Sequence, residues 1–445
     1  MKLRPSDILI FLLSTSILAV GCKGSNNASD ASNTPKDTDT GEKPDLDDVL
    51  TPDDFATPPG GQNVKDVPQF VSIGFDDNGF TDSVAWILDY LKDKKNHDDS
   101  PVRVNFFMAT GYLHKDDINS QYAVPNPGED LNLLRDLWKR AYTDGHGIGN
   151  HTQHHFHGYD QWDSSFTPKD VFTVARWEDE ITRAHNVLAD TEYGPGIEKL
   201  EVVGFRTPFL GYHDNLFKAL ENLNFAYDCS IEDGWQEDQN GTNFTWPYNM
   251  ANGSEGDKVI VDFGFESKAP RDTIGSHPTL WEMPVSPVII PPDYRAQEYG
   301  FTPGLRKRCH DEVKYFDMKQ GKATGLDYNL LEKSSDTYNL NKDEYLATLK
   351  YTLDLRLKGN KAPFLFGAHT DFYSKKNPDF TPPGTTWQER REVIEKFIEY
   401  ALSKPSVKIV TFEDILKYVK DHTPSDNLDS GIDSGTDSGS DSGSK

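Results

Sequence analysis

The stretch that decides the fold is Phe70-Val71-Ser72-Ile73-Gly74-Phe75-Asp76-Asp77-Asn78. Its apolar part, residues 70–75, predicts a buried strand that ends at two adjacent carboxylates. Such carboxylates are costly to place near a core without partners. Because successive strand side chains point to opposite faces, the two can serve different tasks, one holding a metal ion and one moving a proton. The alternative is a polar turn, for which Asp-Asp-Asn-Gly is ordinary composition.

Along the rest of the chain, short apolar runs alternate with amphipathic helical patterns. The candidate strands are residues 70–75, 102–109, 202–205, 225–231, 258–263, 280–285, 363–368 and 407–412. The candidate helices are residues 82–92, 132–144, 177–190, 214–223, 342–357 and 386–403. This alternation predicts parallel β-α units in an α/β barrel or sheet. Residues 232–257 and 285–363 hold few strand signals, so we expect long loops that wall a substrate groove.

Charged and imidazole side chains collect near the ends of several candidate strands, where an α/β barrel builds its active site. Besides Asp76 and Asp77, they are His151, Arg206, Asp228 and His369. Taken alone, Arg206 and Asp228 are more typical of a structural ion pair and a polar loop. A lone histidine such as His369 is usually structural.

The segment His151-Thr152-Gln153-His154-His155 predicts a metal site. Its first and last histidines are four residues apart, and on a helical turn both imidazoles would lie on one face. Two histidines and one carboxylate leave positions open for water and substrate, as a catalytic divalent site requires. A solvated histidine-rich loop is the alternative. Three further imidazoles are expected at surface or supporting positions, namely His146, His154 and His157.

The ends of the chain indicate export and flexibility. A basic start and an apolar stretch over residues 8–20, shorter than the ~20 residues of a spanning helix, predict a signal peptide over residues 1–21. Cys22 resembles the lipidated cysteine of a bacterial lipoprotein, which favours anchoring to the cell envelope, with Lys23 favouring the outer membrane. Residues 22–66 predict a flexible acidic linker, residues 67–422 the catalytic domain, and residues 423–445 a disordered Asp/Ser/Gly-rich tail.

Charge and cysteine content limit the partners and the chemistry. The net charge of −26 over 445 residues argues against nucleic acid and against an anionic membrane surface. Cys229 and Cys309 could form a disulfide in an oxidising compartment, or remain two buried thiols.

Five motifs in this order resemble the polysaccharide deacetylase family, carbohydrate esterase family 4, with its NodB-homology domain. The first three are Gly74-Phe75-Asp76-Asp77-Asn78, Gly149-Asn150-His151-Thr152-Gln153-His154-His155 and Arg206-Thr207-Pro208-Phe209, and the others surround Asp228 and His369. Chitin deacetylases of the eukaryotic type are the most similar branch. The segments shared with that branch are Phe209-Leu210, Tyr227-Asp228-Cys229-Ser230-Ile231 and Trp246-Pro247-Tyr248.

The resemblance implies a distorted (β/α) barrel of about seven strands with long loops, flanked by disordered terminal segments. It implies that Asp77, His151 and His155 hold a divalent metal, most often Zn²⁺, with Co²⁺, Ni²⁺ or Mn²⁺ as alternatives. Such a metal lowers the pKa of bound water toward ~7. Asp76 would be the general base, and Arg206 would orient it and keep it ionised.

The resemblance also implies the acid half of the mechanism. The backbone N–H of Phe209, with the metal, would stabilise the oxyanion. His369 would protonate the departing amine, and Asp228, or its rival Asp233, would hold the His369 ring and raise its pKa. Gly367 replaces a leucine that lines the acetyl pocket in the family. Another side chain must therefore close that pocket, and the candidates are Leu365, Phe366 and Trp281.

The function that the resemblance implies is metal-dependent hydrolysis of N-acetyl groups on an acetylated glycan, with release of acetate. Chitin or chito-oligosaccharide is favoured, and peptidoglycan N-acetylglucosamine is the runner-up. An O-acetyl polysaccharide esterase is third. A non-catalytic glycan-binding lipoprotein stays open as a different class of function.

Overall fold

The computed structural model describes residues 57–114, 123–162, 168–254, 256–258, 274–332, 337–377 and 384–423. The predicted signal peptide, Cys22, most of the linker and nearly all of the C-terminal tail lie outside these residues. So does most of the candidate strand at 258–263. Within the described ranges, no helix is both long and apolar enough to cross a membrane.

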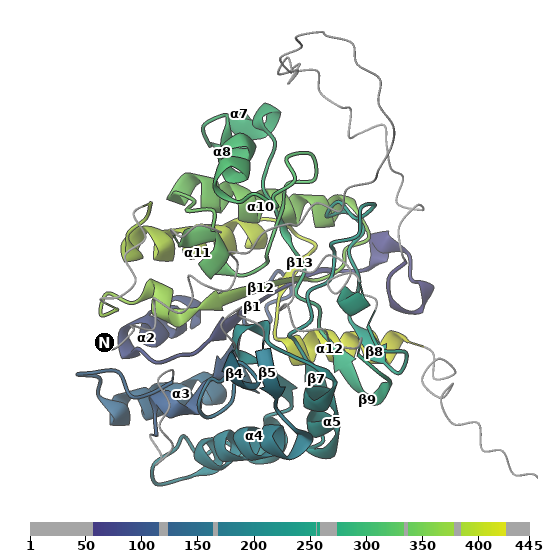
Figure 1. The fold of residues 1–445 in the computed structure, drawn as a ribbon. Coiled ribbons are helices and arrows are strands. Elements are labelled where there is room, and N and C mark those ends of the chain that lie inside the picture. Colours follow the sequence, from purple (N-terminus) through teal and green to yellow (C-terminus); the bar gives the residue numbers. More distant parts are fainter. Residues whose placement is uncertain are drawn as a thin grey trace, which may run out of the picture.

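A curled nine-stranded sheet forms the centre of the fold, with the order β12-β1-β2-β3-β6-β7-β9-β8 (Figure 1). All pairings in this sheet are parallel except that of β8 with β9. The ninth strand, β13, pairs with residues 69–71 at the start of β1, and β2 pairs with residues 74–75 on the same edge of β1. The strands are β1 (Gln69–Asp76), β2 (Asn105–Met108), β3 (Gly147–Asn150), β6 (Gly204–Phe205), β7 (Tyr227–Asp228), β8 (Tyr248–Met250), β9 (His277–Glu282), β12 (Phe364–His369) and β13 (Val407–Ile409). The predicted α/β class and distorted-barrel arrangement are confirmed.

Helices cover the outside of the curl, with α10 and α11 beyond β12 and α4 and α5 toward the other end (Figure 1). They are α2 (Thr81–Leu91), α3 (Leu131–Thr143), α4 (Val174–Ala189), α5 (Asp214–Asn222), α7 (Ala296–Tyr299), α8 (Leu305–Glu312), α9 (Asp327–Leu331), α10 (Lys342–Lys358), α11 (Trp387–Leu402) and α12 (Phe412–His422). Two small antiparallel sheets pair β4 (Tyr159–Trp162) with β5 (Pro168–Val171) and β10 (Val288–Ile289) with β11 (Lys322–Ala323).

Successive side chains of β1 and β12 alternate between an outer core beneath the helices and the inside of the curl. In β1, Val71, Ile73 and Phe75 pack in the outer core beneath the helices, whereas Phe70 belongs to the inner cluster. In β12, Phe364 and Phe366 are likewise outer residues. The intervening residues of both strands therefore face the inside of the curl. At the carboxyl ends of the two strands, these inward-facing residues are Asp76 and His369.

Helix α12 closes the amino-terminal end of the curl, and the sequence analysis did not predict it. The Phe412 N–H donates to Asn105 Oδ1 at 2.8 Å, and the Tyr227 hydroxyl donates to Glu413 Oε1 at 2.7 Å. Apolar residues of α12 join the inner cluster. The chemistry is therefore confined to the opposite end.

Strand β3 was also missed, because Gly147-Ile148-Gly149-Asn150 reads as a turn. A Cβ on Gly147 would lie 2.3 Å from Asn105 Nδ2, and one on Gly149 would lie 2.3 Å from Phe107 Cδ1. The two glycines thus make room for side chains of β2.

The long loops expected within residues 285–363 are partly wrong. This stretch also carries β10, β11, α7, α8 and α9. Helix α8 was missed because its sequence, Leu-Arg-Lys-Arg-Cys-His-Asp-Glu, buries only Leu305 and Cys309. Cys229 and Cys309 are buried free thiols in different core clusters.

The fold begins before residue 67. Short 3₁₀ turns at Pro59–Gly61 and Val64–Asp66 precede β1. The Tyr418 hydroxyl of α12 donates to Gln62 Oε1 at 3.0 Å. The last residues of the predicted linker therefore pack against the closing helix.

We predict that Gly149→Ala destabilises the protein by about 1–3 kcal/mol, because the added methyl overpacks against Phe107. Denaturant unfolding monitored by circular dichroism measures the change. Gly275→Ala is the control, because its Cβ would meet only the Asp214 side chain, at 3.1 Å. Equal stabilities for the two variants would contradict the close packing of β3 on β2.

Candidate functional site

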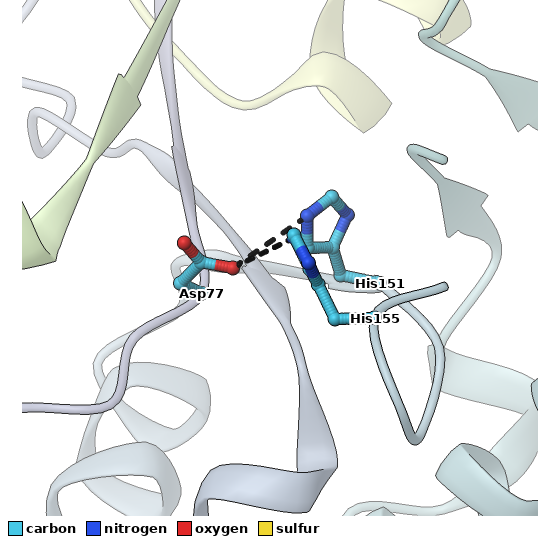
Figure 2. Close-up of side chains that lie close together, drawn as sticks. All are labelled: Asp77, His151 and His155. Carbon is cyan, nitrogen blue, oxygen red and sulfur yellow. Dashed lines mark ion pairs between the residues drawn. The ribbon is translucent and has the colours of Figure 1, made fainter. Parts of the chain in front are cut away.

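Three potential metal ligands lie together at the carboxyl end of the parallel sheet (Figure 2). Asp77 Oδ1 lies 3.1 Å from His155 Nε2 and 3.8 Å from His151 Nε2. One ligand atom from each residue lies within 4.8 Å of the others, and the described residues hold no other such cluster. The structure thus brings the three predicted ligands together.

The protonation states of these residues suit a cation. His151 Nδ1 lies 2.7 Å from the Arg206 carbonyl oxygen, so it donates there and Nε2 keeps its lone pair toward Asp77. Burial lowers the pKa of His151 to about 4, which keeps the ring neutral near pH 7. Burial alone would raise the pKa of Asp77, but His155 and the nearby imidazoles lower it below its usual range.

The donor set fits a divalent metal. Asp77 Oδ1 is buried and makes no hydrogen bond of regular geometry. A buried carboxylate oxygen without a donor, next to two imidazoles, is the arrangement that a bound cation would satisfy. The residues therefore fit zinc or a similar ion.

The loop that carries the histidines is not a helical turn, contrary to the prediction. Thr152 and His155 have left-handed φ angles of 64° and 55°, a conformation that is costly for residues other than glycine. The Thr152 N–H donates to Asn150 Oδ1 at 2.8 Å, and the His155 N–H donates to Thr152 Oγ1 at 3.0 Å. These bonds fold the loop so that His151 and His155 face Asp77.

Glu180 on α4 anchors the same loop. His154 Nδ1 lies 2.9 and 2.8 Å from the two Glu180 oxygens, and the His154 N–H donates to Oε2 at 3.3 Å. Both side chains are buried. His154 thus has the supporting position expected of it, but Glu180 was missed because one glutamate in an amphipathic helix carries no distinguishing signal.

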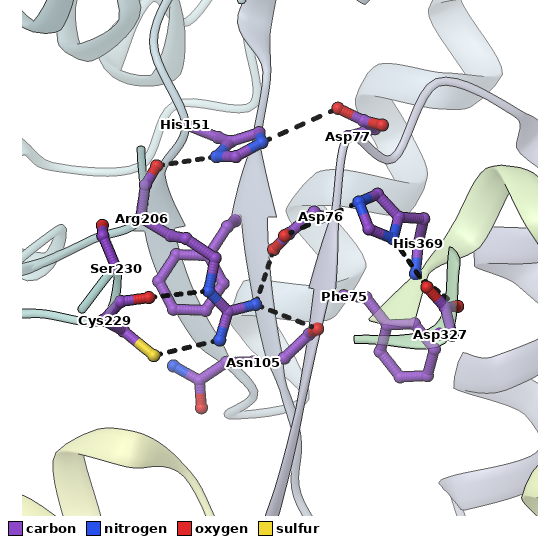
Figure 3. A network of polar contacts seen from close by, with 12 residues as sticks. Phe75, Asp76, Asp77, Asn105, His151, Arg206, Cys229, Ser230, Asp327 and His369 are labelled. Atoms are coloured by element: carbon purple, nitrogen blue, oxygen red, sulfur yellow. Dashed lines mark hydrogen bonds and ion pairs between the residues drawn. The ribbon is translucent and has the colours of Figure 1, made fainter. Parts of the chain in front are cut away.

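Asp76 is the buried carboxylate at the end of β1 (Figure 3). Its Oδ1 accepts a hydrogen bond from Arg206 Nη1 at 2.8 Å, and its Oδ2 lies 3.9 Å from His369 Nε2. Asp77 lies beyond the strand with a φ of 68°, so strand alternation does not separate the two carboxylates as the sequence suggested. The turn directs both side chains into one site, and their different neighbours distinguish them.

Arg206 is fully enclosed inside the curl. Its Nε donates to the Cys229 carbonyl oxygen and its Nη2 to Cys229 Sγ, both at 3.0 Å. The guanidinium lies 4.4 Å from the centre of the Phe107 ring and 5.7 Å from that of Phe412. Burial opposes the charge, but Asp76 raises the pKa of Arg206 above its ordinary value. The charge therefore persists and fixes Asp76.

His369 is held by Asp327, not by Asp228. Its Nδ1 lies 2.7 Å from Asp327 Oδ1, and its N–H donates to Asp327 Oδ2 at 2.9 Å. Burial lowers the pKa of His369, but Asp327 together with Asp76 and Asp77 outweighs burial and raises it to about 10. Sequence analysis missed Asp327 because it lies in the stretch expected to form loops.

Asp228, assigned to that task from the sequence, has other partners. It accepts hydrogen bonds from the Ser230 N–H at 2.8 Å and the Ser230 hydroxyl at 2.9 Å. It also pairs in register with Glu282 of β9. Burial raises the pKa of Asp228 to about 6 and that of Glu282 well above its usual value. Its rival Asp233 is buried as well, and the Asp233 N–H donates to the Val285 carbonyl oxygen at 3.2 Å.

Phe209 borders the metal site. It lies in the 3₁₀ turn Pro208–Leu210 with a left-handed φ of 59°. Its ring centre lies 4.7 Å from that of His155 and stacks at 3.6 Å on His157. The strained backbone is typical of a functional position, and the role of the Phe209 N–H as an oxyanion donor stays a prediction.

Two further carboxyls near the site, both half-buried, were not among the candidates. Asp371 accepts from the Gly79 N–H at 3.4 Å, and burial together with Asp77 raises its pKa well above the usual value. Burial raises the pKa of Glu332 to about 7. The position of Asp371, two residues after His369, was the one available signal.

Part of the sequence matches a known protein family and a curated protein. Residues 63–227 match the family model "Polysaccharide deacetylase". Chitin deacetylase 8 of Bombyx mori is 22% identical over 228 residues, covering 51% of this chain and 49% of that protein. The chain thus spans about half the length of this curated relative.

Two solved structures are also similar. A protein of Mycobacterium smegmatis assigned as a polysaccharide deacetylase has 14% identity and a TM-score of 0.45, over 84% of this chain and 96% of its own. The chitin deacetylase of Colletotrichum lindemuthianum has 18% identity and a TM-score of 0.25, over 37% and 56%. The family-model match, whose span includes Asp76, Asp77, His151, His155 and Arg206, identifies residues 63–227 as part of a polysaccharide deacetylase domain.

Proposed function

We propose that this protein hydrolyses N-acetyl groups on a polysaccharide in a metal-dependent reaction that releases acetate. The observation that carries the proposal is the position of Asp76. Its carboxylate is bound by Arg206 on one side and faces His369 on the other, next to the Asp77–His151–His155 cluster. A base, an acid and a cation site next to one another are the groups that amide hydrolysis requires.

Asp76 is the proposed base. It removes the proton from the water that attacks the acetamide carbonyl, and the Arg206 contact at 2.8 Å fixes its orientation. Asp77, His151 and His155 would hold a divalent cation, which would lower the pKa of bound water and polarise the carbonyl.

His369 is the proposed acid. Because Asp327 raises its pKa to about 10, the ring is protonated at neutral pH and can donate a proton from Nε2 to the departing amine. An amine is a poor leaving group without that proton, whereas an alkoxide needs it less. The protonated acid therefore supports N-acetyl over O-acetyl substrates.

Chitin or chito-oligosaccharide is the proposed substrate. The support is the similarity to a chitin deacetylase and the chitin-deacetylase-like segments around Phe209 and Asp228. We also propose export and anchoring through Cys22, on the sequence alone. Acetate release from chitopentaose, peptidoglycan and acetylxylan tests the substrate class. Binding to one of these without release from any would contradict the proposed activity.

Base and ligand variants should separate chemistry from metal binding. We expect Asp76→Asn to reduce kcat about 10²–10⁴-fold and to keep its metal content, because Asp76 acts as the base. We expect His151→Ala to lose metal. Acetate release measures kcat, and plasma emission spectrometry measures metal content. Wild-type rates in both variants would refute the site assignment.

The pair of Asp327 with His369 predicts a pH effect. His369 is active when protonated, and Asp327 holds its pKa up, so the proton is lost only as pH rises through about 10. Asp327→Asn should move the alkaline limb of the kcat/KM profile about 1–3 units toward lower pH. In the control Asp228→Asn the position of this limb should not change. A shift in Asp228→Asn alone would restore the assignment made from the sequence.

Glu180→Gln should weaken zinc binding about 10–100-fold, because Glu180 anchors the loop that carries both histidine ligands. Titration calorimetry of the metal-free protein measures the affinity. Asp179→Asn is the control on the same helix, since Asp179 is exposed and pairs with Arg183. Equal affinities would show that the buried Glu180–His154 pair does not position the ligands.

A further inference from the structure

Two paired glycines lie directly below the catalytic pair of β1 and β12. Gly74 is opposite Gly367 in the parallel register, two residues before Asp76 opposite His369. Side chains two residues apart in a strand point to the same face. The sheet therefore presents no side chain of its own immediately beneath Asp76 and His369.

Other parts of the chain fill the space over these glycines. A Cβ on Gly74 would lie 3.0 Å from Arg206 Nη1 and 2.9 Å from Phe107 Cε2. A Cβ on Gly367 would lie 2.0 Å from Leu326 Cδ2. The Arg206 guanidinium thus occupies the space over Gly74, and the Leu326 side chain occupies the space over Gly367.

Leu326 arrives from a segment that runs alongside β12. It forms a parallel bridge with Gly367, whose N–H donates to the Gly325 carbonyl oxygen at 2.9 Å. The next residue, Asp327, holds His369. A single short segment therefore delivers both the carboxylate that supports the acid and the apolar side chain beneath it.

The side chains expected from the sequence at this place lie elsewhere. Phe366 belongs to the outer core, so it faces away from the site. Leu365 and Trp281 lie in the inner cluster together with Leu326. Only Leu326 takes the position that a side chain on Gly367 would occupy.

We propose that Leu326 is the residue that sets the size of the acyl group that this enzyme removes. The inference rests on the proposed function. The acyl carbonyl must lie beside Asp76, His369 and the cation site, so its alkyl end must point away from these charged groups. Leu326 is the apolar side chain over Gly367, two residues before His369 on the same face of β12, and it is 2% exposed. A longer alkyl chain would meet it.

The experiment compares N-propionyl with N-acetyl chito-oligosaccharide on the wild type and on Leu326→Ala. We expect the ratio of kcat/KM for propionyl over acetyl to rise about 10-fold or more, since one methylene in an apolar pocket changes discrimination by about 10–200-fold. Leu330→Ala, which truncates a buried leucine of the outer core on the helix that follows Leu326, should leave the ratio unchanged. Leu326→Val serves if the alanine variant does not fold, with a smaller rise expected.

A side-chain swap tests the geometry itself. Gly367→Leu alone should lower the unfolding midpoint, because the new side chain meets Leu326. The double variant Leu326→Gly/Gly367→Leu should recover both the midpoint and the wild-type acyl ratio. If the wild type releases acetate and the Leu326 variants keep its ratio, the inference is wrong and the proposed function stands. If the wild type releases no acyl group from any substrate, both fail.

Discussion

The buried Arg206 charge is the constraint on which the site depends. A guanidinium at 1% exposure is tolerated only if its charge is paired and its donors are satisfied. Asp76 supplies the charge, Cys229 accepts two hydrogen bonds, and the Phe107 ring covers the flat face. Removing one partner of such a pair typically costs about 3–5 kcal/mol. The core and the proposed base, Asp76, are thus held by the same contacts.

The need to seat this charge explains residues that look unremarkable in the sequence. Gly74 leaves room for the guanidinium, and Gly149 leaves room for the Phe107 ring that covers it. Helix α12 adds Phe412 at 5.7 Å and closes the curl below. Strand β3 is therefore poor in apolar residues because its neighbours fill the space, which is also the reason that its sequence resembles a turn.

Sequence alone predicted the residues whose chemistry is local. Asp76 and Asp77 follow an apolar strand, and His151 and His155 share one short segment, so spacing and residue type made them candidates and the family resemblance gave them their expected roles. It did not predict the His369 partner, because Asp327 lies 42 residues away and meets His369 only through the pairing of Leu326 with Gly367. The helical turn expected for the histidines was wrong because Asn150 and Thr152 stabilise left-handed backbone instead.

Two neighbouring carboxylates can differ in role because the backbone turns between them. Asp76 is still part of β1 and faces Arg206, whereas Asp77 has a φ of 68° and faces two imidazoles. Left-handed backbone recurs at Thr152, His155 and Phe209, near the same cluster of side chains. Each such residue costs about 1–3 kcal/mol, and such strain persists only where surrounding contacts impose it. The buried ion pair and the packed loop supply those contacts, so they maintain the strained geometry in which Asp76 and Asp77 face different partners.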